Sequence, residues 1–307
     1  MSGLFLGQTF FQAAGMVLKG VKAMNQTAST IYLVESSFYL EVYLDPFNKR
    51  IRVDDYRGNL NQLIEKAEEL VKHHQAEKLI IKGRTEDFLV FLEHGLQQEA
   101  VVDRYFHGSD AHFFSKFYTQ DRKLNDHWIT EDGMVHSIYQ LDTTVQKTYP
   151  PKEYELKKAD ESCAAGLSAL YRQVFQIYPT PLHDPEYVKK TMKDGTIYYV
   201  FFYQGKIVSA ASAEINSFYK NAELTDCATL PEHRKYGLMK LILQELEGEL
   251  KRDGIFCAYS IARSLSFGMN AVLYQLGYSY RGRLMNNCYI YDKLENMNMW
   301  VKNLANC

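Results

Sequence analysis

The stretch AELTDCATLPEHRKYGLMKLILQELEGEL, residues 222–250, decides how the C-terminal half of the chain folds. Its first residues have the character of a β-strand, which ends before Pro231, and the apolar spacing that follows predicts a helix over 235–252. Unpaired N–H groups and the dipole at the start of such a helix attract anions, and Gly237 lets the backbone approach a phosphate closely. The turn is therefore a candidate phosphate site, although an ordinary strand-to-helix turn can look the same.

The residues on either side of this stretch predict a mixed α/β domain over 153–293. Strands are expected at 153–158, in IYYVFFY (197–203), IVSAASAEI (207–215) and FCAYSIA (256–262), and as two closing strands within 278–292. Helices are expected at 161–177, 184–194 and 267–276. This order of elements indicates a mainly antiparallel sheet flanked by helices.

A second pattern of the same kind covers residues 28–117. Strand-forming runs (IYLVES, FYLEVYLD, KRIRVDDY) precede a helix predicted over 59–75. The stretches VFLEHGLQQEAVV and VLYQLGYSYRGRL share an apolar helix end and a glycine, so that Gly95 matches Gly277 and Leu92 matches Tyr274. We therefore expect the two halves to be tandem copies of one fold.

Three further segments complete the predicted organisation. Residues 1–27 are an appendage of unassigned role, in which Met24 is an alternative start. Residues 118–152 are polar, end in Tyr149-Pro150-Pro151 and are expected to form an irregular linker. Residues 294–307 are expected to form a C-terminal tail.

The turn at Gly237 resembles the acetyl-CoA signature of the GNAT superfamily of N-acetyltransferases. That signature reads Arg/Gln-x-x-Gly-x-Gly/Ala after a strand and a proline, and here it reads Arg234-Lys235-Tyr236-Gly237-Leu238-Met239. Met239 replaces the last small residue, which bears on how tightly the turn holds a pyrophosphate. A second family signature also fits, with Asn270 followed four residues later by Tyr274. The resemblance implies a catalytic GNAT domain at 153–293, and a degenerate GNAT-like domain before it without the cofactor turn.

The resemblance also implies roles for residues. The backbone of Cys227, Ala228 and Thr229 would pair with the pantetheine arm of acetyl-CoA, which Asn270 would also contact, and residues 234–239 would hold the pyrophosphate. Tyr274 would protonate the departing thiolate, and Glu223 would act as general base. Asp226 is a second carboxylate on the same predicted strand. Its odd spacing from Glu223 places the two on opposite faces, so only one can serve.

Three further stretches are informative, VFQIYPTPLHDPEYV (174–188), YSIARSLSFGMNAVLYQLGYSYRGRLMNN (259–287) and FLEHGLQQEAVVDRYFHGSDAHFFSKF (91–117). With them, nearly the whole chain, about 30–302, resembles the bacterial and archaeal β-lysine N6-acetyltransferases. The resemblance implies acetyl transfer to the distal amine of β-lysine, which makes a compatible solute, with a lysine 2,3-aminomutase as the source of the substrate. Tyr178 and Arg263 are candidates for binding this acceptor, and a structural ion pair is an equal alternative for Arg263. The N-terminal half would cover the acceptor site or form a dimer contact. Another amine or a protein lysine as acceptor, and a CoA-binding sensor without turnover, stay open as alternatives.

Charge and cysteine content exclude several other classes of function. The net charge of −2 argues against nucleic-acid or membrane partners. The chain has five cysteines and no C-x-x-C pair, so neither a disulfide framework nor a zinc site is expected, and no metal is assigned. These cysteines indicate a reducing, cytoplasmic location.

Overall fold

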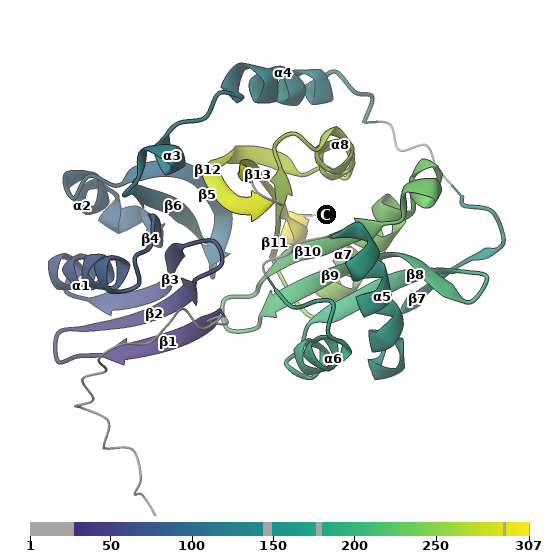
Figure 1. Cartoon of the computed structure of the whole chain (residues 1–307), viewed down its shortest axis with the longest axis horizontal. Helices are drawn as coiled ribbons and strands as arrows, with labels where there is room; N and C mark the ends of the chain where they lie inside the picture. The colour runs from purple at the N-terminus through teal and green to yellow at the C-terminus, as the bar shows by residue number, and fades with distance from the viewer. Residues whose placement is uncertain (1–27, 144–148, 176–179, 291–292, 307) are drawn as a thin grey trace, which may run out of the picture.

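The computed structural model describes residues 28–143, 149–175, 180–290 and 293–306, which form a mixed α/β fold built on one 13-stranded sheet (Figure 1). The N-terminal half contains β1 (Ser29–Val34), β2 (Phe38–Asp45), β3 (Arg50–Gly58), α1 (Leu60–His73), β4 (Lys78–Arg84), α2 (Phe88–Glu93), β5 (Gln97–Phe106) and β6 (Ser109–Phe117). The C-terminal half contains β7 (Tyr154–Lys158), α5 (Ala164–Val174), α6 (Pro185–Lys193), β8 (Ile197–Tyr203), β9 (Lys206–Asn216), β10 (Asn221–Thr229), α7 (Leu238–Arg252), β11 (Cys257–Arg263), α8 (Phe267–Gln275), β12 (Ser279–Ile290) and β13 (Lys293–Asn303). Two helices, α3 (Gln120–Lys123) and α4 (Trp128–Tyr139), lie between the halves in sequence. The appendage at 1–27 lies outside the described residues.

The two halves repeat one order of elements. The chain runs β1-β2-β3-α1-β4-α2-β5-β6 in the first half and β8-β9-β10-α7-β11-α8-β12-β13 in the second. The strands are arranged β1-β2-β3-β4-β6-β5 in the first half and β8-β9-β10-β11-β13-β12 in the second, so the sheet reads alike outward from its centre. Gly95 and Gly277 occupy equivalent turns with φ of +77° and +84°. This topology supports the expectation of tandem copies, with β7, α5 and α6 as additions to the second.

The halves join where β5 and β12 meet side by side. Gly282 on β12 pairs with Ala100 on β5. A side chain on Gly282 would overlap the carbonyl oxygen of Glu99, so the close approach requires glycine. The two halves therefore form one continuous sheet.

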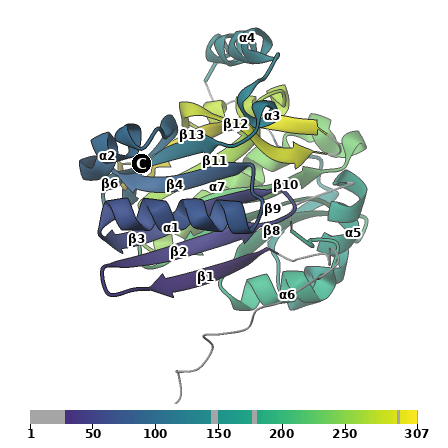
Figure 2. The same ribbon diagram turned by 60° about the vertical axis from the view of Figure 1, so that its left-hand side comes forward.

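The faces of the sheet are covered differently in the two halves (Figures 1 and 2). Helices α1 and α2 cover one face of the N-terminal half, over a core that includes Leu40, Val53 and Phe114. Helices α7 and α8 cover one face of the C-terminal half, while α5 and α6 cover part of the other. The remaining faces of the two halves pack on each other in a shared core to which Ile80 and Tyr259 belong. We call the surface that carries this shared core the inner face.

In the segment that we expected to be an irregular linker, 118–152, the described residues form helices at 120–123 and 128–139. Helix α4 lies across the top of the molecule in Figure 1 and packs on α8. Ile138 is fully buried, and the buried carboxylate of Glu131 accepts a hydrogen bond of 2.7 Å from Asn296 Nδ2. The helix carries Gly133 and no regular apolar stripe, which explains why the sequence pattern hid it.

The prediction of a C-terminal tail at 294–307 is also wrong, because β13 spans Lys293–Asn303 and lies between β11 and β12 in the sheet. The two closing strands expected within 278–292 are in fact the long, bulged strand β12, and β13 follows it. Buried asparagines on β13, Asn296 and Asn298, break the apolar pattern that would have indicated a central strand.

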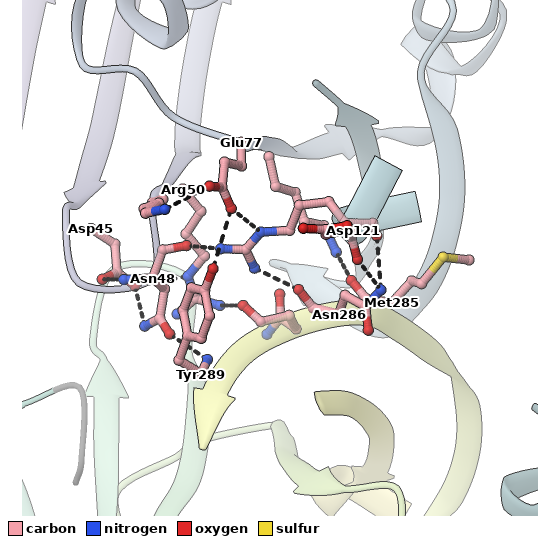
Figure 3. A network of polar contacts seen from close by, with 12 residues as sticks. Asp45, Asn48, Arg50, Glu77, Asp121, Met285, Asn286 and Tyr289 are labelled. Carbon is pink, nitrogen blue, oxygen red and sulfur yellow. Dashed lines mark hydrogen bonds and ion pairs between the residues drawn. The ribbon is translucent and has the colours of Figure 1, made fainter. Parts of the chain in front are cut away.

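A buried polar network ties the turn after β2 to α3 and to β12 (Figure 3). The Arg122 guanidinium is fully buried and donates to Glu77 Oε2 at 3.1 Å, to the Asn286 carbonyl at 2.6 Å and to the Asn48 carbonyl. The Tyr289 amide donates to Asn48 Oδ1 at 2.8 Å. Removing one member would leave buried polar groups without partners, so the network holds the two halves in one arrangement.

In the described part of the chain, no helix is long and apolar enough to span a membrane.

Candidate active site

The predicted phosphate turn connects β10 to α7 through the 3₁₀ helix η3 (Pro231–Tyr236). Helix α7 begins at Leu238, three residues later than the sequence pattern indicated, because Gly237 adopts a left-handed conformation with φ +66°. The first N–H groups of α7, at Leu238 and Met239, have no acceptor within a helix. They form the positive end of a 15-residue helix, which is an arrangement suited to a pyrophosphate.

The two cations of the turn lie at the surface. Arg234 is exposed, and its Nε donates to the Thr229 carbonyl at 3.1 Å. Lys235 is also exposed, and its ammonium lies 5.1 Å from the centre of the Tyr236 ring. Both side chains therefore lie beside the start of α7, where they can meet phosphate oxygens.

Aromatic side chains pack against the turn, and the sequence pattern did not reveal them. Tyr154 on β7 shares a 2.6 Å hydrogen bond with His233 Nδ1, and its ring lies 4.8 Å from Tyr203 and 5.0 Å from Tyr236. A tyrosine at the start of a predicted strand carries no signal of this role, because only the folded sheet brings β7 close to the turn. This packing restrains the conformation of residues 231–236.

Strands β10 and β11 pair only over their first residues and then separate. Their parallel register runs from Asn221↔Cys257 to Glu223↔Tyr259 and stops there. The pairing of β10 with β9 also shifts between Thr225 and Ala228, at a bulge where Asp226 has φ +52°. The structure thus brings the backbone of 227–229 to a gap between strands, where the family resemblance would place the pantetheine arm. Burial raises the pKa of the Cys227 thiol, which argues against a thiolate nucleophile there.

Asn270 does not point into that gap. Its side chain is fully buried and donates to the carbonyls of Arg263 (2.9 Å) and Ser266 (2.8 Å). Its oxygen accepts from Asn298 Nδ2 and from Trp300 Nε1. All its hydrogen-bonding capacity is used inside the protein. The Asn270 side chain therefore joins α8 to β11 and β13, and the contact of this residue with pantetheine stays a prediction.

Tyr274 lies under α4. Its hydroxyl donates to the Tyr139 carbonyl at 3.2 Å, and the two rings meet edge to face with their centres 5.3 Å apart. The sequence pattern assigned the segment 118–152 no part in the site, yet its helix α4 holds this hydroxyl. The tyrosine is half-buried, on the helix that follows the separated end of β11.

Two carboxylates face each other across β9 and β10. Glu223 is directly opposite Glu214 in the antiparallel register. Crowding by protein atoms, together with Glu223 and Asp226, raises the pKa of the Glu214 carboxyl to about 8, although its side chain also reaches solvent. Asp226 Oδ2 accepts a 2.7 Å hydrogen bond from the Ser212 hydroxyl. Sequence reasoning missed Glu214, because only the register of the β9–β10 pair places it beside Glu223.

The structure describes one of the two residues that we expected to bind the acceptor. The Arg263 guanidinium forms a two-pronged ion pair with Glu295, with N–O distances of 2.6 and 2.7 Å. This is the alternative role that the sequence left open for Arg263. Tyr178 lies outside the described residues. Among the residues that the structure does describe, no group of three His, Cys, Asp or Glu side chains could hold a metal ion.

Comparison with known proteins agrees with this arrangement. The profile of the Acetyltransferase (GNAT) family matches residues 164–278. N-acetyltransferase YodP of Bacillus subtilis (strain 168) is 38% identical over 260 residues, which cover 85% of this chain and 94% of that protein. Beta-lysine N(6)-acetyltransferase of Methanosarcina mazei is 34% identical over 68% of this chain and 85% of its own length. The protein of the same name from Methanococcus maripaludis is 32% identical over 85% of this chain and 95% of its own length. This chain therefore belongs to the GNAT family of acetyltransferases.

Proposed function

We propose that this acetyltransferase moves the acetyl group of acetyl-CoA to the N6 amine of β-lysine and so makes N6-acetyl-β-lysine, a compatible solute. The observation that carries the proposal is the position of Glu223. It is the last residue of β10 paired with β11, at the mouth of the gap between the strands, and it lies opposite Glu214. Carboxylates in this place suit a cationic amine. Two relatives named for this reaction, matched over most of their length, support the choice of substrate.

The chemistry needs a base because the acceptor arrives as an ammonium ion. An aliphatic amine has a pKa near 10.4, so at neutral pH roughly one molecule in a thousand is neutral. Glu223 accepts the ammonium proton, directly or through water. The amine nitrogen then bonds to the thioester carbonyl carbon and gives up a second proton. The C–S bond breaks and Tyr274 donates a proton to the sulfur, so the second proton from nitrogen restores the tyrosine. The products are an amide and the free thiol of CoA, with one proton released overall.

The acetyl-CoA would lie over the turn at 234–239, with its phosphates at the start of α7. Its pantetheine arm would run along the backbone of residues 227–229, where β10 has left β11. A lysine 2,3-aminomutase would supply the acceptor, and a reducing cytoplasm is where this pair would work.

A panel of acceptors tests the proposal. Release of CoA thiol is measured with β-lysine, α-lysine, 1,5-diaminopentane and a lysine peptide with a blocked N-terminus, each at several concentrations. We expect the highest kcat/KM with β-lysine. A higher value with the peptide or the diamine would replace β-lysine by another acceptor class. Binding of acetyl-CoA without turnover of any amine would instead indicate a sensor.

A further inference from the structure

We propose that the N-terminal half supplies part of the acceptor site, and that Arg52 of that half binds the carboxylate of the amino-acid substrate. The inference rests on the proposed function, since it assumes an acceptor that carries a carboxylate as well as an amine. It assigns a substrate-selecting role to a half of the chain that has no cofactor turn of its own.

The orientation of β3 places Arg52 on the inner face. Ile51 and Val53 belong to the core under α1, so Arg52 and Asp54 point to the opposite side of the strand. Arg52 pairs with Ile80 on β4, and Ile80 belongs to the shared core. Arg52 is therefore directed toward the C-terminal half and away from the helices of its own half.

Glu223 is directed to the same inner face from the other half. Its neighbours Ala222 and Leu224 belong to the core under α7, and its partner on β11, Tyr259, belongs to the shared core. In the repeated topology Glu223 and Arg52 occupy equivalent places, each the third residue of a strand that pairs in parallel with the next. The equivalent positions carry opposite charges on facing surfaces.

The residues that the N-terminal half directs to the inner face here include two cations and two carboxylates. The Asp54 carboxylate accepts hydrogen bonds from Arg52 Nε at 2.6 Å and from Arg52 Nη2 at 3.0 Å. It also pairs with the Lys82 ammonium at 2.7 Å. Burial opposes ionisation of Asp54, but Arg52 and Lys82 hold its pKa well below the usual range. Glu41, two residues before Tyr43 on β2, is a second carboxylate within electrostatic range of Arg52 and Lys82, so the charges here balance. Arg52 bonds to Asp54 through Nε and Nη2, and its Nη1 has no hydrogen-bond partner among the described residues. The ring of Tyr43, directly across from Arg52 on β2, supports the guanidinium at 4.9 Å.

The residues that the C-terminal half adds here are carboxylates, and they lie within electrostatic range of Arg52 and Lys82. Glu223 is among the groups that hold the pKa of Arg52 above its usual value, after Asp54 and against the effect of burial. Arg52 and Lys82 in turn oppose the rise in the pKa of Glu214, which burial and Glu223 cause. Tyr187 on α6 lies within electrostatic range of this group, since burial and then Glu214 raise its pKa to about 12.

This distribution of charge matches a diamino acid and not a simple diamine. Lysine-like acceptors carry a carboxylate at one end and an ammonium at the other. The carboxylates of β9 and β10 suit the ammonium, while the Nη1 side of the Arg52 guanidinium, which Asp54 does not bind, offers donors to a carboxylate. A diamine without a carboxylate would leave Arg52 Nη1 without a partner. Arg52 should therefore select for the acid group and have little effect on the chemical step.

The test compares two acceptors that differ only in the carboxylate. 1,4-Diaminopentane has both amines of β-lysine at the same spacing and lacks the acid group. We expect the wild-type protein to prefer β-lysine, and Arg52→Gln to raise KM for β-lysine by about tenfold or more, the size of one charge-assisted hydrogen bond. With 1,4-diaminopentane, KM should change less than about twofold, and kcat should be kept with both acceptors.

A matched variant controls for the loss of a surface ion pair. Arg281 is bound to Asp103 at 2.7 Å and is 41% exposed, so Arg281→Gln should leave the preference for the acid unchanged. Equal losses with both acceptors, or no loss with β-lysine, in Arg52→Gln would overturn the proposal. So would an Arg263→Gln variant that abolishes the preference while Arg52→Gln keeps it.

A second variant and a second pair of acceptors cover the cases in which Arg52→Gln does not fold or β-lysine is not a substrate. If Arg52→Gln does not fold, Arg52→Lys keeps the charge and replaces the fork by a single ammonium, and the preference for the acid should again narrow. If the wild-type protein does not use β-lysine, the proposed function fails. The inference is then measured with α-lysine against 1,5-diaminopentane, and a wild-type preference for the diamine overturns it.

Discussion

The carboxylate of Glu223 is assigned the proton of the acceptor amine, and this role has a characteristic pH dependence. Glu223→Gln keeps the size of the side chain and removes the base, so the rate at pH 7 should fall about 10²–10⁴-fold. The deficit should shrink toward pH 10, where the amine loses its proton unaided. Initial rates of both proteins from pH 6.5 to 10 measure this. A deficit that stays constant over that range would assign Glu223 a structural role.

Glu214 gives a second prediction, about stability. Its pKa is about 8 in the folded chain against an ordinary 4.5, so between these values the folded state binds more protons than the unfolded state. Its contribution to the free energy of unfolding therefore falls as pH rises from about 4.5 to 8, and is constant above that. Glu214→Gln removes this loss. Urea unfolding at pH 5, 6.5 and 8 should show the variant gaining on the wild type, whereas a constant difference would contradict the shifted pKa.

Tyr274 holds its hydroxyl proton toward the Tyr139 carbonyl in the structure, at 3.2 Å. As the proton donor to the thiolate it must turn from that carbonyl to the sulfur. Tyr274→Phe keeps the ring contact with Tyr139 and should lower kcat about 10²–10⁴-fold with acetyl-CoA affinity retained. Single-turnover rates isolate the chemical step. An unchanged single-turnover rate would remove Tyr274 from the mechanism.

Local motifs predicted the conformation of some residues and not the contacts of others. Gly237 was found because a left-handed turn before a helix leaves a mark in sequence. The structural role of the Asn270 side chain was missed because its partners Asn298 and Trp300 lie on β13, a strand that the sequence pattern did not reveal. Glu214 and Arg52 were missed because their importance depends on strand register and on the facing of two halves, which one sequence does not reveal.

Among the elements, the junction of β10 and α7 carries the cofactor prediction. Gly237→Asp would add a negative charge and a side chain where phosphates are to bind, so the Kd for acetyl-CoA should rise by about tenfold or more. Gly254→Asp is the matched control. Gly254 also has positive φ, +69°, has open space around it, and lies just past the other end of α7. Titration calorimetry with acetyl-CoA compares them. Equal affinities in the wild type and Gly237→Asp would place the cofactor elsewhere.

Elements with clear periodicity were predicted closely and the others were not. The helix expected at 59–75 is α1, Leu60–His73, and the strand FCAYSIA is the core of β11, Cys257–Arg263. Helix α4 was missed because it is held by tertiary contacts, the buried ion pair of Glu131 with Arg283 among them, and not by an apolar stripe. The sequence therefore revealed the strand-to-helix junction at Gly237 but not the helix that covers Tyr274.

On the scale of the whole molecule, the halves are parts of one body. They share a sheet, a core on the inner face and the network around Arg122. The similarity of VFLEHGLQQEAVV to VLYQLGYSYRGRL indicated the duplication, since both turns need a glycine with positive φ. It could not indicate that the copies face each other, because that arrangement depends on contacts spread over the whole sheet.

The identity of the acetylated product tests the proposed function most directly. The purified chain is incubated with acetyl-CoA and β-lysine at pH 8, CoA release is followed, and the product is examined by NMR and tandem mass spectrometry. We predict one thiol released for each β-lysine consumed, with the acetyl group on N6. Acetyl found on the 3-amine, or acetyl-CoA left unconsumed with β-lysine while another amine is acetylated, would contradict the assignment.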